Sequence, residues 1–533
     1  MPFPSLRTGG PQRLFLSYSL AWLALVIHAS AFLMLGRTND ESFYLAAIHN
    51  VSAGLVPYRD FCFPQGPLLP YAYAMLIQLL PGGRLLAARL VSLAILLASV
   101  KLLAGLASRT GGRRAAMLVV GVVVLNPYAI HHLTLVKTYA LVSFLLILAV
   151  RCLDKGPAGF TGAAAALSLA TATRLVAAPV LVWLFVWGAR RMSITQLVRA
   201  GLVAVTVLAF TLGAFELASE GRLHASLYVP LAGTPGLNEV TAYQLAVHQP
   251  DDFVSSVDRK LSHLLRSLLA FGLPLVVLLP TVGTRLGVCG LVSPRPPAAT
   301  FAGGAAALLA VTHMLAHRPY DEYQTVTFFP LIAYVVLSIR FQEFRLDPGA
   351  TCGQGWRRAA TWTLTCAVVL SPIWRSMALL DLNPSGPVAL RVSRAGESVR
   401  RWTRPGTRVL ALDAIVSVES GRDLDPLLAM GQFAYRPGWD SATCARNGFV
   451  NAPMLIESIQ DRRYGTVLLA DRDLLDGPVE QASWLSRLRQ EIDTALQSQY
   501  EFAGIVPGSR PDRPLVVWRL SSVLMKTGTV EIP

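Results

Sequence analysis

The sequence predicts an α-helical protein that crosses a membrane about eleven times and ends in a small extramembrane α/β domain. The composition favours a membrane protein, because hydrophobic residues make up 53% of the 533 positions and charged residues only 15%, with a mean hydropathy of +0.48. Soluble globular chains carry about 25% charged residues, so water alone is not the solvent of this chain. The α/β domain is indicated by a change of pattern after residue 380, where charged residues become regular.

Apolar stretches recur along the first 380 residues, and each is a candidate membrane-spanning helix. They cover residues 14–35, 85–107, 114–130, 132–150, 160–172, 175–189, 198–216, 266–289, 299–316, 323–339 and 359–380. The stretches 160–172 and 175–189 are shorter than the ~20 residues of a straight span, so we expect them to be tilted or re-entrant. The first stretch exceeds the ~7–15 residues of a signal-peptide core, and further spans follow it, which predicts a retained helix.

Positive charges between these stretches predict the orientation. If the N-terminus is cytoplasmic, one set of alternate loops carries a group of cationic residues, and these fall on the inner side. They are Arg109, Arg113, Arg114, Arg151, Lys155, Arg190, Arg191, Arg199, Arg285, Arg295, Arg340, Arg345, Arg357 and Arg358. The opposite loops hold Asp40, Glu41, Asp60, the segment 217–264, and Asp321 with Glu322. We therefore expect a multi-pass protein of the cell inner (plasma) membrane, with the site and the C-terminal domain extracytoplasmic.

The C-terminal segment reads as a small α/β domain. Its predicted strands lie at 408–413, 466–470, 502–506 and 515–520, and helical spacing of Leu and Ile covers 478–498. No Gly-rich phosphate loop follows the first strand, so nucleotide binding gets no support. The sequence thus predicts a membrane domain at 1–380 and an extracytoplasmic domain at 381–533.

The sequence also excludes several classes of site. A net charge of +15 would suit nucleic acid if the cations formed one patch, but they stand in short clusters between apolar runs, so no nucleic-acid partner is expected. The six Cys residues contain no CxxC pair and no Cys/His ligand spacing. This argues against a disulfide scaffold and a structural zinc site.

The first predicted outer loop carries the most informative motif. Thr38–Tyr44 places two adjacent carboxylates directly after the first helix, Gly54–Phe61 contains a Gly-Pro-Tyr turn element, and the Pro-rich Pro64–Tyr71 returns to the membrane. This arrangement resembles the GT-C glycosyltransferases, in particular the branch that contains protein O-mannosyltransferases and the lipid A aminoarabinose transferase. Weaker likeness lies at 171–175 and 317–330.

The resemblance implies a GT-C-like bundle of eleven or more helices with an outer C-terminal domain. It also implies a hexosyl- or pentosyltransferase that takes a sugar from a polyprenyl-phosphate donor, with a catalytic acidic residue just beyond the first helix. That position is held by Asp40, followed by Glu41. The expected partners are the lipid-linked sugar donor, membrane lipids, and a glycan, lipid or protein acceptor.

The chemistry of such a transfer supports these residues. It requires a base that takes the acceptor proton and cations that stabilise the departing phosphate. One carboxylate suffices for a single displacement with inversion, and Asp40 suits this role. The alternative is that Asp40 and Glu41 only cap the helix that begins at Ser42. We favour catalysis because the turn element of Gly54 and Pro57-Tyr-Arg-Asp60 follows.

Substrate-binding candidates come from three places in the chain. Tyr58, Arg59 and Asp60 form the turn element of the first outer loop. Lys137 lies within an apolar stretch and Arg174 between two, where a cation is costly unless it is paired or lies in a wet cavity. The segment 317–323 adds two further candidates, Arg318 and Tyr323. The alternative for the cations is that they only extend to the membrane interface.

No cofactor is assigned from the sequence, and a divalent metal stays an option that the sequence disfavours. Many GT-C relatives carry a second acidic residue between helices three and four, whereas residues 126–139 contain no carboxylate. Lys137 would supply part of the positive charge that a divalent metal brings. His131 and His132 are adjacent, a spacing that suits packing better than metal ligation.

Two other functions remain open from the sequence. Intramembrane Arg and Lys residues would also suit a transporter or flippase of an anionic or lipid-linked substrate, although we find no inverted repeat. The chain would also suit a non-catalytic GT-C relative whose C-terminal domain recruits partners. Sugar transfer from a polyprenyl-phosphate donor distinguishes the three functions.

Overall fold

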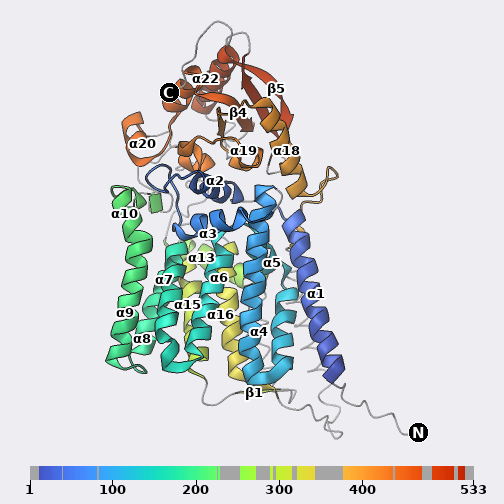
Figure 1. The fold of residues 1–533 in the computed structure, drawn as a ribbon, viewed down its shortest axis with the longest axis vertical. Coiled ribbons are helices and arrows are strands. Elements are labelled where there is room, and N and C mark those ends of the chain that lie inside the picture. The colour runs from blue at the N-terminus through green and yellow to red at the C-terminus, as the bar shows by residue number, and fades with distance from the viewer. Residues whose placement is uncertain are drawn as a thin grey trace, which may run out of the picture.

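A bundle of helices carries an α/β unit at one of its ends (Figure 1). The computed structural model describes residues 11–38, 40–80, 83–224, 226–227, 253–271, 289–291, 296–314, 321–341, 376–435, 439–470, 483–508 and 514–521. Most of the predicted apolar stretches are helical. The helices of the bundle are α1 (Pro11–Leu35), α4 (Arg84–Val124), α5 (Pro127–Thr134), α6 (Thr138–Leu153), α7 (Phe160–Thr173), α8 (Ala178–Gly188), α9 (Ile194–Leu208), α10 (Ala214–Ala218), α13 (Phe253–Ala270), α15 (Pro297–Met314) and α16 (Thr325–Ser338).

Three of the described helical segments are long and apolar enough to cross a membrane. They are Leu16–Leu35, Arg84–Val124 and Ile194–Ala218, and a fourth results if the bent pair α5 and α6 forms one span. The predicted count of about eleven stays a prediction. The stretches 266–289 and 359–380 lie partly outside the described residues.

The predicted stretch 85–107 and the first part of 114–130 are joined within α4, and the second stretch ends in α5. The backbone leaves helical geometry at Gly111 and Gly112, and Gly112 has a φ of 63°. Glycine adopts this left-handed conformation without the steric penalty of a side chain. The change of direction therefore falls within the predicted cationic loop, between Arg109 and Arg113.

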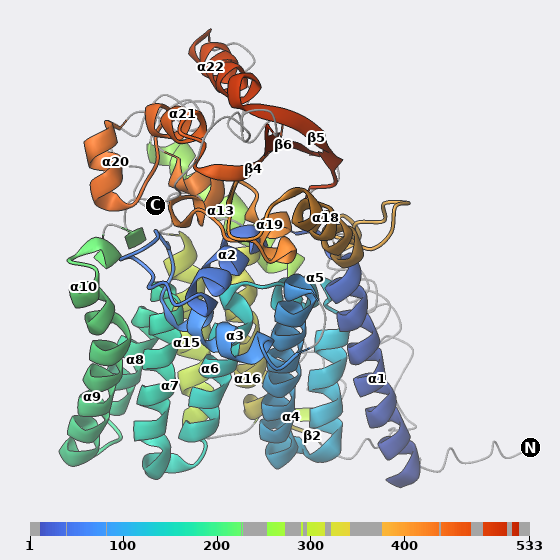
Figure 2. The same cartoon turned by 45° about the horizontal axis from the view of Figure 1, so that its top comes forward.

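The end of the bundle opposite the α/β unit carries cationic loops. Arg109 and Arg151 donate to the Asp154 carboxylate at 2.6 and 3.0 Å. A two-stranded antiparallel ribbon of β1 (Cys289–Leu291) and β2 (Ile339–Phe341) also lies at this end (Figures 1 and 2). The ribbon was not predicted, because two loops far apart in sequence pair their backbones there. Which end faces outward stays a prediction.

The α/β unit contains a four-stranded sheet with the order β3-β4-β6-β5. Its elements are α18 (Val388–Trp402), β3 (Arg408–Ala411), α19 (Ala414–Ser420), α20 (Ser441–Asn447), α21 (Ala452–Gln460), β4 (Tyr464–Ala470), α22 (Ser483–Gln499), β5 (Tyr500–Val506) and β6 (Leu515–Leu520). β3 pairs parallel with β4, and the other pairs are antiparallel. All four predicted strands are present, and α22 confirms the described part of the predicted helix.

Two short helices, α2 (Glu41–Ser52) and α3 (Leu68–Ile77), lie between the bundle and the α/β unit (Figures 1 and 2). One hydrophobic cluster contains Leu45 and Ile48 of α2 together with Ile415 and Val418 of α19. Burial of such apolar surface stabilises the contact by ~25 cal/mol per Å². The α/β unit is therefore packed onto the segment that follows α1.

Candidate functional site

Interruptions between helices converge beneath the α/β unit. α5 and α6 meet at a bend of 105°, and Lys137 lies in the break with an extended backbone. Arg174 lies in a second break between α7 and the 3₁₀ turn η2 (Leu175–Ala177), also with an extended backbone. In membrane proteins such breaks are tolerated where the backbone is buried in protein or lines a polar cavity. These two breaks place two cations at the same end of the bundle.

The Lys137 ammonium joins two carboxylates from distant parts of the chain. Its Nζ atom donates to Asp40 Oδ2 at 3.2 Å and to Glu322 Oε1 at 2.8 Å. Glu322 belongs to the 3₁₀ turn η4 (Asp321–Gln324) and also accepts a hydrogen bond from the Tyr139 hydroxyl at 3.2 Å. The Lys137 side chain is 1% exposed, whereas Asp40 is 42% and Glu322 18% exposed. The cation therefore lies at the base of the group and Asp40 at its open side.

Arg174 completes the group. Its guanidinium lies over the Tyr139 ring at 4.8 Å and over the Tyr323 ring at 5.1 Å, and its Nη1 donates to the Thr138 hydroxyl at 3.0 Å. Aromatic faces attract a guanidinium without using its N–H groups. We call Asp40, Lys137, Tyr139, Arg174, Glu322 and Tyr323 the Lys137 cluster.

Asp40 is not the cap of the helix that follows it. It occupies the N-cap position of α2, but its side chain makes no capping hydrogen bond. An N-cap side chain normally accepts from the second or third backbone N–H of the helix. The Asp40 carboxylate instead accepts from Lys137, so the capping alternative does not describe this residue.

Glu41 has a different environment from its neighbour. It forms an ion pair with Arg89 in which both side chains are fully buried, with Nε to Oε1 at 3.0 Å. Glu41 Oε1 also accepts from the Val136 backbone N–H at 2.8 Å, one residue before Lys137. The sequence grouped Glu41 with Asp40 as catalytic, whereas these contacts brace the break that carries Lys137.

Tyr58, Arg59 and Asp60 close the turn of the first outer loop. Asp60 accepts from the Val56 N–H at 2.7 Å and from Arg59, which holds the pKa of the Asp60 carboxyl below its ordinary value. Tyr58 has a φ of 69° and donates to the Gln65 carbonyl at 2.5 Å. Among the described residues, no hydrogen bond joins these three side chains to the Lys137 cluster. Their assignment to substrate binding stays a prediction.

The sequence missed two members of the cluster. The sequence gave Tyr139 no role, and it assigned Glu322 to a predicted outer loop without a role. No local signal pairs Glu322 with Lys137, because 185 positions separate the two residues. Arg318 lies outside the described residues.

His131 and His132 are buried among aromatic rings. His131 packs against Phe32, and His132 against Tyr128 and Tyr139. Among the residues that the structure describes, no group of three His, Cys, Asp or Glu side chains is arranged to hold a metal ion. His132 Nδ1 also lies 3.9 Å from Glu322 Oε2, at the edge of the Lys137 cluster. The packing role of the two imidazoles stays a prediction.

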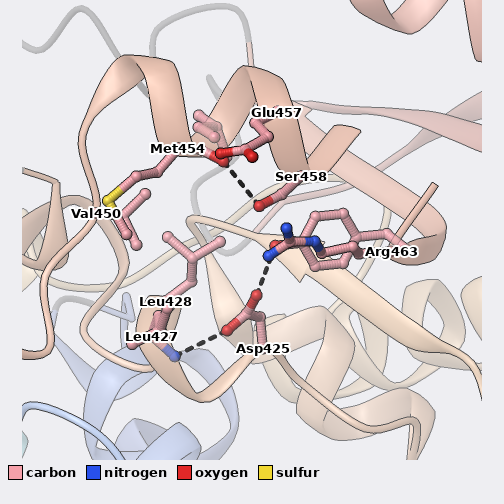
Figure 3. A pocket seen from close by; sticks show the side chains of 10 residues that line it. Asp425, Leu427, Leu428, Val450, Met454, Glu457, Ser458 and Arg463 are labelled. Atoms are coloured by element: carbon pink, nitrogen blue, oxygen red, sulfur yellow. Dashed lines mark hydrogen bonds between the residues drawn. The ribbon is translucent and has the colours of Figure 1, made fainter. Parts of the chain in front are cut away.

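A separate cavity lies in the α/β unit (Figure 3). Its lining includes Asp425, Met454, Ser458 and Arg463. Asp425 accepts from the Leu427 N–H at 2.9 Å and from the hydroxyl of Tyr464, whose pKa is raised by burial. Both carboxylate oxygens of Asp425 are thus engaged in local structure, and none of the lining residues belongs to the Lys137 cluster.

Comparisons with known proteins give structural matches alone. No protein-family model and no curated protein matches the sequence. ArnT from Cupriavidus metallidurans bound to undecaprenyl phosphate matches with a TM-score of 0.58 at 13% identity, over 97% of this chain and 99% of that one. The apo state of the same protein gives 0.56 at 13% identity, over 96% and 98%.

An oligosaccharyltransferase from Archaeoglobus fulgidus, in complex with zinc and sulfate, matches with a TM-score of 0.42 at 12% identity, over 90% of this chain and 71% of that one. The ArnT matches cover nearly the whole length of both chains. The chain therefore has the fold of ArnT, which confirms the resemblance to the GT-C glycosyltransferases at the level of the fold.

Proposed function

We propose that the chain is a membrane glycosyltransferase that moves a hexosyl or pentosyl group from a polyprenyl-phosphate donor to an extracytoplasmic acceptor. The observation that carries this proposal is the Asp40 carboxylate, which does not cap its helix and is held 3.2 Å from a buried lysine at a partly exposed position. A carboxylate at such a position can reach a substrate hydroxyl. A sealed carboxylate cannot.

The reaction proceeds by a single displacement. Asp40 takes the proton of the acceptor hydroxyl while the acceptor oxygen attacks the anomeric carbon of the donor sugar. The bond from that carbon to the phosphate oxygen breaks, and the electron pair leaves with the polyprenyl phosphate. One displacement inverts the anomeric configuration, and one base suffices for it, in contrast to the paired carboxylates of glycoside hydrolases.

The buried Lys137 and the half-buried Arg174 stabilise the leaving phosphate. Lys137 carries its charge between Asp40 and Glu322, and the Arg174 guanidinium lies over two tyrosine rings and donates from Nη1 to the Thr138 hydroxyl. A planar guanidinium suits bidentate contact with a phosphate. Glu322 balances the charge of Lys137 before the donor binds. This ion pair offsets the desolvation cost of the buried ammonium.

The fold supports a lipid-linked donor. ArnT, the protein with the matching fold, carries undecaprenyl phosphate in its solved structure. We therefore propose a polyprenyl phosphate as the lipid of the sugar donor. The acceptor is a glycan, a lipid or a protein, and membrane lipids surround the bundle. Tyr58, Arg59, Asp60 and Arg318 remain candidates for acceptor or donor contacts.

The proposal is tested with the purified protein in lipid nanodiscs. Labelled polyprenyl-phosphate sugars are supplied with a cell-envelope acceptor extract, and sugar transfer and released polyprenyl phosphate are measured together. We expect equal amounts of both products, and their loss in Lys137→Met. In proteoliposomes, movement of the intact donor across the bilayer without release would support a flippase, and donor binding with neither outcome would support a non-catalytic relative.

We also propose that the membrane domain covers 1–380 and that the domain 381–533 is extracytoplasmic. The Arg-rich loops at the end opposite the α/β unit support this orientation. A reporter fused after residue 400 should be active outside the cell, and one fused at residue 112 inside. A cytoplasmic signal from the fusion at 400 would overturn the proposed side of catalysis.

A further inference from the structure

The segment that carries Asp40 is hydrogen-bonded to the C-terminal part of the chain at its first end. We call the described residues 36–38 and 40–42 the Asp40 loop. Arg37 N donates to the Leu379 carbonyl at 2.9 Å, and Asp381 N donates to the Leu35 carbonyl at 2.7 Å. Gly36 and Leu380 form the antiparallel bridge between them. The start of the loop is therefore paired, strand-like, with the segment 379–381.

The second end of the Asp40 loop has its own contact with the α/β unit. The Ser42 hydroxyl accepts from the backbone N–H of Ala414 at 2.8 Å. Ala414 is the first residue of α19, and Ser42 is two residues from Asp40. Both ends of the loop are thus attached to residues beyond 378.

The bundle holds the loop from the other side. Arg89 donates to the Leu33 carbonyl at 2.7 Å and to the Gly36 carbonyl at 3.0 Å, in addition to its ion pair with Glu41. A Cβ atom at Gly36 would lie 2.4 Å from the Phe32 carbonyl oxygen, so only glycine fits this approach. Arg89 therefore holds residues on both sides of Asp40, while the Asp40 side chain stays 42% exposed.

A buried ion pair anchors the segment 379–381. Arg391 of α18 donates to Asp381 Oδ2 at 2.5 Å and to the Gly386 carbonyl at 2.7 Å, and both charged side chains are at most 4% exposed. α18 packs closely on α19, since a Cβ atom at Gly396 would lie 2.6 Å from the Glu419 Cβ. The ion pair therefore links the attachment at 379–381 to α18, and α18 packs on α19, which carries the attachment to Ser42.

We infer that the C-terminal unit is a positioning part of the active site, which holds Asp40 through the Ser42–Ala414 hydrogen bond and the Asp381–Arg391 ion pair. The inference rests on the proposed function of Asp40. A displacement of ~1 Å at a reacting group costs on the order of 100-fold in rate. Lys137 and Arg174 lie in the bundle breaks, so loss of these contacts lowers kcat and leaves donor affinity unchanged.

The experiment compares positioning variants with a matched surface control. Ser42→Ala removes one hydrogen bond without leaving a buried charge, and Asp381→Asn weakens the ion pair. We expect each to lower kcat by about 10- to 100-fold, with the Kd for polyprenyl phosphate within about twofold of wild type. Ser42→Thr keeps the hydroxyl and should recover most of the rate. Arg400→Gln, which breaks the exposed Arg400–Glu397 pair of α18, should leave kcat unchanged.

Hydrogen exchange supplies a readout that needs no transferase activity. The backbone amides of 36–44 and 379–381 should exchange at least about tenfold faster in Asp381→Asn than in Arg400→Gln. Unchanged exchange, or wild-type kcat in both Ser42→Ala and Asp381→Asn, would overturn the inference. A parallel fall of kcat and donor affinity would overturn it as well. Absence of transfer by the wild-type protein, with faster exchange in the variant, would instead contradict the proposed function of Asp40.

Discussion

Asp40 and Glu41 are neighbours in the sequence with the same charge, yet their surroundings differ completely. Glu41 and its partner Arg89 are both fully buried. Asp40 shares the buried Lys137 with Glu322 and stays 42% exposed. One carboxylate is sealed inside the protein, and the other is partly exposed at the end of the bundle that carries the α/β unit.

The comparison shows that burial decides whether a carboxylate must keep its partner or can exchange it for a substrate. Sealed charges must keep their partner, because an unpaired buried charge costs several kcal/mol. An open carboxylate can exchange its partner for a substrate, since water or a hydroxyl can replace the lost contact. Adjacent residues can therefore serve separate purposes when a helix start turns one inward and the other outward.

The largest effect is expected for Asp40→Asn. Asn keeps the size of the side chain and no capping bond is lost, but it cannot accept a proton, so transfer should fall by ~100- to 10,000-fold. The measurement is turnover in membranes normalised for protein amount, with the melting temperature as the control. Wild-type turnover by this variant would remove Asp40 from the chemistry.

The next largest effect is expected for the stability of the buried Glu41–Arg89 ion pair. Glu41→Gln leaves the Arg89 charge buried without its counter-charge, which should reduce the free energy of unfolding by about 3–5 kcal/mol. Thermal unfolding in detergent measures this loss, and correctly inserted protein should fall with it. Adding Arg89→Met should recover part of the stability, because it removes the orphaned charge. A Glu41→Gln protein of normal stability would show that the pair is not sealed.

A smaller effect is expected for the affinity of the donor lipid when Arg174 is substituted. Arg174→Ala should weaken polyprenyl-phosphate binding by about 10- to 100-fold, in line with ~1.5–3 kcal/mol for hydrogen bonds to charged groups. Arg174→Lys should recover only part of the affinity, because an ammonium lacks the planar fork. The Kd of the donor lipid measures both, and normal affinity in Arg174→Ala would leave the cation with a packing role over its two tyrosine rings.

The partly exposed Arg59–Asp60 ion pair contrasts with the buried Glu41–Arg89 pair. The hydrogen bond from Arg59 lowers the folded pKa of Asp60, so the pair adds stability above the ordinary carboxyl pKa and loses it as the pH falls through the lowered value. Asp60→Asn should therefore cost less than about 1 kcal/mol near pH 7. The difference from wild type should shrink below about pH 4, as followed by unfolding at several pH values. A cost that persists in acid would point to the turn geometry instead.

The smallest effect is expected from a chelator. Lys137 Nζ already lies between the carboxylates of Asp40 and Glu322, where a divalent cation would otherwise bind. Treatment with EDTA should leave the rate within about twofold, since the ammonium supplies the positive charge. Loss of activity that magnesium or manganese restores would show that a metal displaces Lys137 from the two carboxylates.

Much of the fold was predictable because its signals are local. Apolar runs predict helices through the hydrophobicity of consecutive residues, and the four strands of the α/β unit follow from short β-branched runs. Lys137 and Arg174 stood out because a cation in an apolar run is costly unless it is paired. The β1–β2 ribbon escaped prediction, because its two strands are about fifty positions apart and each has only three residues.

The sequence by itself determined that this chain folds in a membrane, that an α/β unit follows the helices, and that Asp40, Lys137 and Arg174 are unusual in their positions. Only the tertiary structure decided which partners they have. In the tertiary structure Glu322 binds Lys137 across 185 positions, and Glu41 forms an ion pair with Arg89. The Asp40 loop is hydrogen-bonded to Leu379 and Ala414. Hydropathy depends on neighbouring residues, whereas the pairing of buried charges depends on how the breaks between distant helices meet in space.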